Sequence, residues 1–577
     1  MRTEDQVRSE AELVLGFNNS VPDVEQGVGQ ITTFNTLGFP GVLYKPDGWY
    51  LPKDVTEVAI ILETKSESTK ISKPKIKDEL LQNCDIARTR YDRVVGILYN
   101  GKECIVYKNN VEDTSCPKTL QPKKYYLELF DSDILDKELI YNLTAKINNC
   151  LHTEFGIKNL YHRMIFTACA LVAKRYGAVL TPGMDYTTFH TAIHSTLSKS
   201  LIEAKKQNQK LDILLEVYSE IKMNSCENQV AINNFIEWVS EISSSINSSK
   251  WNGEDVMGIF FNEFNRYKKK SESGQVFTPD HITSLMYRIL EVSKKDRVLD
   301  ATCGSGAFLV KAMSNMINEV GGPKCEEAKK IKANNLYGIE FDREIFALSC
   351  ANMLIHKDGK TNIEQMDART SEAARWIQSK NITKVLMNPP YETKYGCMKI
   401  VKNVLDSVPE QTDCAFILPD KKLEKSSKTL VKEILDAHTL KKIIKLPESL
   451  FFGVGVKPSI FIFKTGTPQN KKDIYGCYIE DDGFATVKNQ GRHDVTNTWK
   501  EKEDYWVDSI YKQVDTKYGT GQWINPEHHL SYQVAMPELV LTDKAFLEST
   551  LEYTLFKKGM SKKTFIDTIY NSLFDEK

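Results

Sequence analysis

The stretch VLDATCGSGAFL, residues 298–309, decides the fold of the largest part of this chain. It reads as a short apolar strand that ends at Asp300, a glycine turn at Gly304 and Gly306, and the start of a helix. Glycines at such a turn let the backbone approach a bound ligand closely. A single glycine turn is as often purely structural, so its meaning depends on the segments around it.

Around this stretch, strand and helix patterns alternate from about residue 276 to residue 466. This alternation predicts an α/β fold with a doubly wound parallel sheet. The next strand pattern ends at Glu340, 40 positions after Asp300 rather than the roughly 20 of dinucleotide-binding folds, so we expect a long helix or an insertion between them. Glu340 would lie at the carboxyl edge of the sheet, where ribose hydroxyls are usually bound, and Asp367 would follow at the end of the next strand. The strand patterns are RVLDA, LYGIEF, KVLMN, AFILP, KIIKLP and SIFIFK.

A fourth strand end carries the tetrapeptide NPPY, residues 388–391. Two prolines, Pro389 and Pro390, make the turn rigid. The side-chain carbonyl of Asn388 and the main-chain carbonyl of Pro389 can converge on one planar amine, while Tyr391 stacks on the ring that carries it. Alone, NPPY is more often a tight turn, but after acidic residues on successive strands we interpret it as a catalytic motif.

Together these motifs resemble the S-adenosylmethionine-dependent amino methyltransferases, specifically the adenine-N6 DNA class. Residues 274–279, GQVFTP, resemble that class's extra cofactor-contacting segment, and residues 441–464 resemble the later part of type I modification subunits. The resemblance implies a Rossmann-like methyltransferase sheet, S-adenosylmethionine as cofactor and double-stranded DNA as substrate. It implies cofactor-binding roles for Phe277, Thr278, Pro279, Asp300, Gly304, Gly306, Glu340 and Asp367, and catalytic roles for Asn388, Pro389, Pro390 and Tyr391.

The expected chemistry is direct transfer of a methyl group to an adenine amine in a base flipped out of the duplex, which needs neither a metal nor a covalent intermediate. Cys303 lies on the cofactor side of the turn, and we interpret it as a packing residue. Either Phe451 or Phe452 would be a second wall for the flipped base, and a role in the core is equally compatible with the pattern.

The N-terminal region carries a second candidate site. Asp47 and Glu63 are predicted on neighbouring strands, and Lys65 follows Glu63 in the sequence ETK. Two such carboxylates bind Mg²⁺, and the lysine can orient water or stabilise the charge that develops on a phosphate during cleavage. The pattern is short and common by chance, but the apolar strand EVAIIL before Glu63 places that acid at the end of a buried element.

The segments that follow, residues 80–88 and 91–102, continue this order. The succession resembles the PD-(D/E)XK nuclease domain of type I restriction subunits, which implies a helix glutamine at Gln82. The sequence departs from that pattern at Ile86, where an aromatic residue is expected, and this puts the role of Gln82 in doubt. The resemblance also implies an acidic residue on the first helix, Glu10 or Glu12.

The amino-acid composition excludes few classes of function. Lys and Arg number 76 against 77 Asp and Glu, a net charge of -1, so any site for a polyanion must be a local patch. The 12 cysteines are scattered, without zinc-ligand spacing, and we expect them to be reduced and mostly buried. No apolar run approaches the length of a membrane span and the N-terminus lacks a signal peptide, so we expect a cytoplasmic protein with no membrane contact.

We therefore expect four regions: a nuclease-like domain at 1–115, a helical connector at 125–270, the methyltransferase at 271–500 and a C-terminal tail at 501–577 that is a candidate docking segment. This order resembles type IIG and type IIB restriction-modification enzymes. Because the tail is short for a target-recognition domain, we expect sequence reading by a separate specificity subunit. The near-zero net charge agrees with a partner that supplies part of the DNA grip.

Three alternatives remain open on the sequence. The nuclease domain could be inactive, leaving a methylation-only modification subunit. The same NPPY chemistry also serves enzymes that methylate glutamine amides of proteins or exocyclic amines of RNA. A scaffold that binds cofactor and partner without catalysis is the third.

Overall fold

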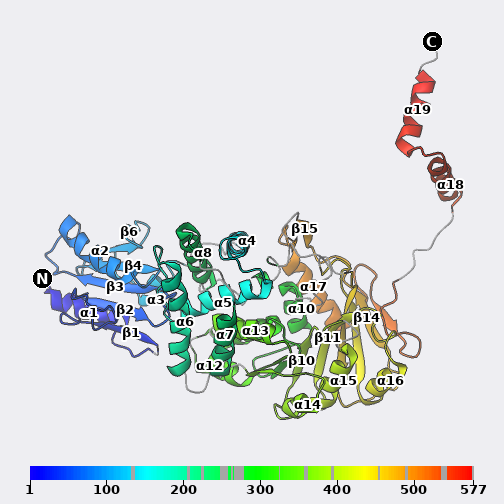
Figure 1. Ribbon diagram of the computed structural model, residues 1–577, viewed down its shortest axis with the longest axis horizontal. Helices are drawn as coiled ribbons and strands as arrows, with labels where there is room; N and C mark the ends of the chain where they lie inside the picture. The colour runs from blue at the N-terminus through cyan, green and yellow to red at the C-terminus, as the bar shows by residue number, and fades with distance from the viewer. Residues whose placement is uncertain are drawn as a thin grey trace. The chain divides into compact units, whose positions relative to one another are not determined.

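The computed structural model describes most of the chain and divides it into two compact units, Met1–Tyr532 and Gln533–Lys577 (Figure 1). Each unit is considered by itself. The residues described are 1–21, 23–130, 137–203, 208–221, 226–246, 258–260, 264, 278–323, 325–356, 362–391, 396–451, 455–487, 491–534 and 542–574.

The N-terminal region is a six-stranded mixed sheet with strands in the order of the chain, and only β3 and β4 pair in parallel. Helices α1 and α2 cover its opposite faces (Figure 1): α1 packs with Ile60 and Leu62, and α2 with Ala59 and Ile61. The strand predicted before Glu63, EVAIIL, is confirmed as β3. The elements are α1 (Glu4–Leu15), β1 (Val24–Val28), β2 (Gly48–Pro52), β3 (Ala59–Thr64), α2 (Pro74–Arg88), β4 (Val94–Tyr99), β5 (Cys104–Lys108), β6 (Val111–Glu112) and α3 (Lys123–Leu127).

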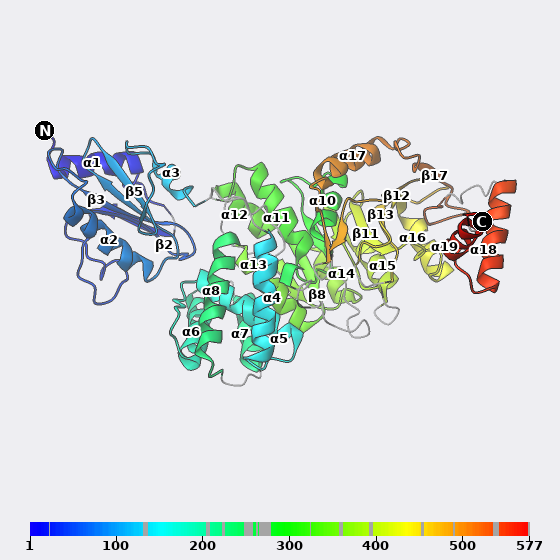
Figure 2. The ribbon, with the colours of Figure 1, turned by 90° about the horizontal axis from the view of Figure 1, so that it is seen from above.

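A cluster of helices follows, as the apolar spacing predicted (Figure 2). Its core is built on aromatic rings that contact one another at centroid distances of 5.5–6.4 Å, those of Phe155, Phe166, Phe189 and Phe235. Rings packed in this way bury large apolar areas, so this region has a core of its own. The helices are α4 (Lys137–Thr153), α5 (Leu160–Arg175), α6 (Tyr186–Glu203), α7 (Asn208–Glu220) and α8 (Gln229–Ile246).

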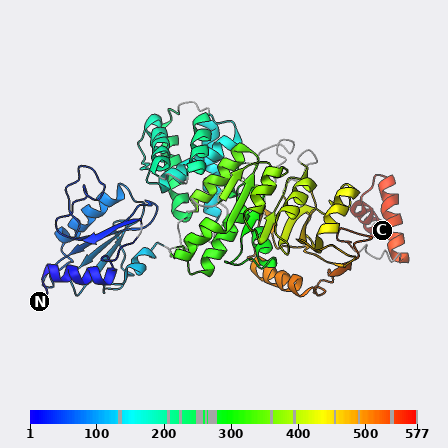
Figure 3. The same ribbon diagram turned by 90° about the horizontal axis from the view of Figure 1, so that it is seen from below.

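The largest element is a nine-stranded sheet in the order β17-β14-β12-β13-β11-β10-β7-β8-β9 (Figure 3). It is mostly parallel, as predicted, with β13 and β17 antiparallel to their neighbours. The described residues between β12 and β13 form no helix that could carry the chain back across the sheet, so β13 returns in the opposite direction. The strands are β7 (Val298–Asp300), β8 (Leu336–Glu340), β9 (Asn362–Gln365), β10 (Lys384–Met387), β11 (Asp413–Pro419), β12 (Thr439–Lys445), β13 (Pro458–Lys464), β14 (Ile474–Tyr478) and β17 (Gln522–Ile524).

Helices cover both faces of this sheet, with α10, α11, α13 and α17 on one face and α14, α15 and α16 on the other (Figure 1). Helix α13 packs on the sheet through Phe346 and Cys350 and on the helical cluster through Leu348 and Ala351, so one helix belongs to two cores. The extra helix α12 accounts for the long spacing between Asp300 and Glu340. The helices are α10 (Asp280–Ile289), α11 (Ala307–Glu319), α12 (Glu326–Asn334), α13 (Arg343–Ile355), α14 (Ser371–Gln378), α15 (Cys397–Ser407), α16 (Lys428–Ala437) and α17 (Trp499–Lys512).

The C-terminal region differs from the expected tail. Residues 501–532 include most of α17 and all of β17, which pairs with β14, so they complete the large sheet rather than extend from it. The hairpin β15 (Ala485–Val487) and β16 (Gly491–His493) lies just before α17 in the chain. The second unit contains α18 (Asp543–Lys557) and α19 (Lys562–Phe574), and many of their apolar side chains are exposed.

The cysteines and the helix lengths bear on two further expectations. All 12 cysteines are free and most are buried. Within the part of the chain that the structure describes, no helix is both long and apolar enough to cross a bilayer.

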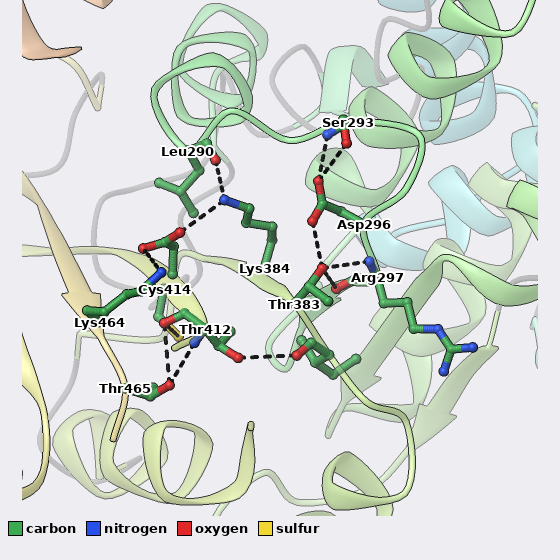
Figure 4. A network of polar contacts seen from close by, with 12 residues as sticks. Leu290, Ser293, Asp296, Arg297, Thr383, Lys384, Thr412, Cys414, Lys464 and Thr465 are labelled. Carbon is green, nitrogen blue, oxygen red and sulfur yellow. Dashed lines mark hydrogen bonds and ion pairs between the residues drawn. The ribbon is translucent and has the colours of Figure 1, made fainter. Parts of the chain in front are cut away.

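An ion-pair network around Asp413 lies at the amino edge of the large sheet, and its two lysines, Lys384 and Lys464, are labelled in Figure 4. Lys384 at the start of β10 and Lys464 at the end of β13 each place Nζ 3.0 Å from this carboxylate. Burial alone would raise the pKa of Asp413, but the two lysines lower it below its usual value.

We expect Asp413→Asn to lower the free energy of unfolding at neutral pH by about 1–3 kcal/mol, because two partly buried lysines lose their counter-charge. A carboxyl whose pKa is lowered by folding stabilises the protein above its unfolded pKa of about 3.9, and this stabilisation is lost as the pH falls through the folded value. Urea unfolding at neutral and acid pH would measure the difference between wild type and variant. An equal difference at both pH values would contradict this assignment.

Candidate active sites

The main pocket lies at the carboxyl edge of the large sheet. Asp300, Glu340 and Asn388 follow or end β7, β8 and β10, and β7 pairs in parallel with both other strands. From β7 the chain builds the sheet in one direction through β8 and β9, and then returns to the other side of β7 as β10. Parallel sheets form ligand-binding crevices at such a switch point. The pocket is lined by Thr278, Asp300–Ser305, Ala307, Phe308, Glu340–Asp342, Ile345, Met366–Arg369, Asn388–Tyr391 and Ile400.

Glu340 is held by the backbone of two loops. Its Oε2 accepts a hydrogen bond from the Gly304 amide at 3.0 Å, and its Oε1 accepts from the amides of Phe341 and Asp342 at 2.9 Å each. Burial raises the pKa of this carboxyl. The side chain therefore joins the glycine turn to the end of β8 at a fixed position in the pocket.

Asp300 is 2% exposed and accepts from the Thr302 amide at 3.1 Å. Burial and the nearby charge of Glu340 raise the pKa of Asp300 to about 8. The ionised form of this carboxyl is therefore disfavoured, and a positively charged ligand would stabilise it.

The glycine turn leaves room for a ligand. Gly304 has φ +56°, and a Cβ there would meet no atom within 4 Å, so any side chain would fill open space beside the carboxylates. The hydroxyl of Thr302 is buried without a hydrogen-bond partner in the same pocket. This vacant volume, the acids and the unpartnered hydroxyl suit a cationic, hydroxyl-bearing ligand, and so they fit S-adenosylmethionine.

Asn388 lies between two hydroxyl groups. Its Nδ2 donates to Thr278 Oγ1 at 3.0 Å, and its Oδ1 accepts from the Tyr391 hydroxyl at 2.7 Å. Lys422 Nζ in turn donates to the main-chain carbonyl of Tyr391 at 3.1 Å. Asn388 Oδ1, the acceptor that a substrate amine would need, is therefore already hydrogen-bonded to the Tyr391 hydroxyl.

The structure brings nearly all of the predicted methyltransferase residues to this pocket. Pro279 and Gly306 lie beside it as the caps of α10 and α11. Asp367 lines the pocket, and its hydrogen bonds with Arg369, 2.6–3.0 Å long, lower its pKa. Phe277 and Phe452 lie outside the described residues.

Phe451 lies near the pocket and Cys303 is part of its lining. Phe451 is buried, and its ring centroid is 6.2 Å from that of Tyr391, so it packs against the motif. Cys303 is also buried, and burial raises the pKa of its thiol well above the usual value, which agrees with a packing role.

The N-terminal acids lie together at one end of β3. Asp47 Oδ2 accepts from the backbone amide and the hydroxyl of Thr64 at 2.7 and 2.8 Å. Glu63 Oε1 accepts from Lys65 Nζ at 2.7 Å, and burial and the charge of Asp47 raise the pKa of Glu63 to about 7. Two repelling carboxylates with a lysine fit a divalent cation in their donor chemistry. Among the described residues, however, no group of three or more His, Cys, Asp or Glu side chains is arranged around one point.

Gln82, the helix glutamine that the resemblance implies, lies on the exposed face of α2. Its side chain is exposed, whereas the neighbouring Asn83 is buried and donates to Glu63 Oε2 at 3.4 Å. Helical spacing could have shown this, because Leu80, Asn83, Cys84 and Ala87 recur on the buried face of α2.

Neither candidate on the first helix is seen to contact the acid pair. Glu10 forms an ion pair with Arg2 and accepts from the Tyr99 hydroxyl at 3.1 Å, while Glu12 is only partly buried. Arg8 on the same helix instead places Nε 3.4 Å from Asp47 Oδ1. The sequence analysis did not predict this contact of Arg8, because the resemblance implied only an acidic residue on the first helix.

Comparisons with known proteins agree with this geometry. Residues 253–419 and 400–515 match the family N-6 DNA Methylase. A relative from Heyndrickxia coagulans, the type II restriction enzyme and methyltransferase RM.BcgI, is 30% identical over 326 residues, covering 54% of this chain and 50% of that protein. The type I restriction enzyme StySPI methylase subunit of Salmonella potsdam is 24% identical over 277 residues, covering 41% of this chain and 51% of that subunit.

A solved chain of a type I R-M system shares the fold at TM-score 0.51 and 14% identity, covering 77% of this chain and 99% of that one. The chain spans about half the length of the curated relatives named above.

We expect binding of S-adenosylmethionine to release a proton from Asp300 near neutral pH. The positive charge of the ligand stabilises the carboxylate and so lowers a pKa that is about 8 in the free protein. The apparent Kd should therefore fall as the pH rises toward 8. Calorimetry in buffers of different ionisation enthalpy measures the proton release, with Asp300→Asn as the control that releases none; a wild-type enthalpy that is independent of buffer would exclude this linkage.

Proposed function

We propose that the protein transfers a methyl group from S-adenosylmethionine to the N6 amine of adenine in DNA, since residues 253–419 and 400–515 match the family N-6 DNA Methylase. The observation that carries the proposal is the convergence of Asp300, Glu340 and Asn388 on one pocket. The cofactor, when bound, supplies an electrophilic methyl group. We also propose the domain limits expected from the sequence, with the methyltransferase domain extended to Tyr532 because β17 pairs with β14.

The chain's own residues would act by positioning. The Oδ1 of Asn388 and the carbonyl of Pro389 would accept hydrogen bonds from the two N–H groups of the amine and localise the lone pair on its nitrogen. Pro390 would keep the turn rigid. Tyr391, released from Asn388, would stack on the flipped base. Glu340 would bind ribose hydroxyls, Asp367 the cofactor adenine, and Thr278, Pro279 and Phe277 the methionine end.

We propose further that the N-terminal site cleaves unmodified DNA with Mg²⁺. Asp47 and Glu63 would hold the ion, and Lys65 would stabilise the charge that develops on the phosphate. The mutual repulsion of two buried acids supports cation binding, and the relative RM.BcgI is named as both restriction enzyme and methyltransferase. A methylation-only subunit with an inactive nuclease domain is the alternative.

A separate specificity subunit is proposed as the partner that reads the DNA sequence. Relatives of the type I class are named as subunits, so they act within assemblies. The specificity subunit would dock on the second unit, Gln533–Lys577. The helices of this unit leave large apolar side chains exposed: Phe546, Leu547, Tyr553, Phe556, Ile566, Tyr570 and Leu573. Exposed apolar groups at this density are typical of interaction surfaces.

We expect Asn388→Ala to lower methyl transfer to DNA at least about a hundredfold, because the amine loses a directed acceptor. Affinity for S-adenosylmethionine should remain within a few fold of wild type. Tritiated methyl transfer to DNA, to protein and to RNA, with the partner present, measures activity and substrate class. Asn362→Ala, at the amino end of β9, is the control, and labelling of protein or RNA instead of DNA would overturn the proposal.

For the nuclease, unmethylated DNA should be cut in the presence of Mg²⁺, and Glu63→Ala should abolish cutting while methylation continues. The exposed Glu25 in the same region gives a control variant, Glu25→Ala, that should cut normally. Gel analysis of a plasmid substrate follows both variants. Methylation by the wild type without any cleavage would establish the methylation-only alternative.

A further inference from the structure

A buried polar cluster outside the pocket joins the hairpin of β15 and β16, and the residues just before it, to α10. His281 Nε2 lies 3.1 Å from Asp482 Oδ2, and Arg492 places NH1 2.9 Å from Oδ2 and NH2 2.6 Å from Oδ1 of the same carboxylate. Asp482 is 0% exposed and His281 7%. A buried carboxylate that is satisfied on both oxygens is rigid, because breaking either contact would leave a charge without a partner.

The imidazole of His281 is also fixed by aromatic packing. The ring of Phe484 stacks on it at a centroid distance of 3.8 Å, and Trp499 contacts its edge at 4.9 Å. All of these partners come from residues beyond 480, whereas His281 lies in the first turn of α10. The cluster therefore fixes the start of α10 against a distant part of the chain.

The start of α10 leads directly to the catalytic motif. The Pro279 carbonyl accepts from the amides of Ile282 and Thr283 at 2.9 and 3.1 Å, so the first turn of α10 is hydrogen-bonded to the residue that directly follows Thr278. Thr278 Oγ1 then accepts from Asn388 Nδ2 at 3.0 Å. That bond fixes one end of the amide, while Oδ1 at the other end accepts from the Tyr391 hydroxyl.

We propose that His281, Asp482 and Arg492 are positioning residues that set the orientation of the Asn388 amide through Thr278. None of the three lines the pocket. Their effect is on the rate of methyl transfer rather than on cofactor affinity, because an amide turned away from the amine fails only in the reacting geometry. The inference rests on the methyltransferase function proposed above.

A second contact extends the cluster to the helical region. The ring of Tyr141 in α4 meets the ring of His493 in β16 edge-on at a centroid distance of 5.0 Å. His493 follows Arg492 directly, so the strand that supplies the guanidinium is also held by α4. The position of Thr278 thus depends on contacts from two regions that are remote in sequence.

The test compares wild type with Asp482→Asn, which keeps the shape of the side chain and removes its charge. We expect kcat for DNA methylation to fall about ten- to hundredfold, with the Kd of S-adenosylmethionine changed by less than about threefold. We also expect faster hydrogen exchange at the amides of Ile282 and Thr283. Asp413→Asn, in the ion-pair network at the opposite edge of the sheet, is the matched control for a general loss of stability: it should change neither kcat nor the Kd, and it should speed exchange at Ile282 and Thr283 no more than at other buried amides.

A double-mutant cycle with Thr278→Val, at saturating cofactor, tests the route. If the cluster acts through Thr278, Asp482→Asn adds little to the loss already caused by Thr278→Val; additive losses overturn the proposal. An unchanged kcat, or unchanged exchange in α10, overturns it as well. Should Asp482→Asn fail to fold, Arg492→Lys, which loses the two-pronged contact, replaces it. A wild type that does not methylate DNA refutes the proposed function, while the exchange measurement still decides whether the cluster holds α10.

Discussion

The parallel pairing of β7 with β8 on one side and β10 on the other is the constraint on which the structure depends. Parallel strands must end at the same edge of a sheet, so this pairing brings Asp300, Glu340 and Asn388 together although 88 positions separate the first from the last. The helices on the two faces, and α13 between two cores, keep the strands in this register. The pocket is thus a product of topology, and its residues supply the chemistry.

This explains how much could be predicted from the sequence. The apolar strands, their polar ends and the NPPY turn are local patterns, and local patterns predicted the α/β class and the composition of the pocket. The reversed direction of β13 and the inclusion of β17 depend on pairings between distant segments, which no local pattern specifies. Side-chain direction was the other gap: Asn83 rather than Gln82 faces Glu63 because of the buried face of α2.

Both candidate sites raise the pKa of a buried acid by the same physical means. Asp300 is raised to about 8 and Glu63 to about 7, in each case by burial and a neighbouring carboxylate. Such buried acids destabilise the folded protein when no ligand is bound, and a positively charged ligand stabilises their ionised form. This is a common property of binding sites. A net charge of -1 therefore says little about DNA, because acids gathered at the two candidate sites offset basic residues elsewhere.

The hydrogen bond between the Tyr391 hydroxyl and Asn388 has a consequence for selectivity. The resting pocket satisfies its own acceptor with one O–H group, so an entering base gains only if it returns at least as good a donor. An exocyclic amine does so with an N–H group, whereas a carbonyl at the same ring position, as in thymine or guanine, would leave the amide oxygen facing another oxygen. Under the proposed function, this exchange of one donor for another would disfavour thymine and guanine, but not cytosine, before any chemistry begins.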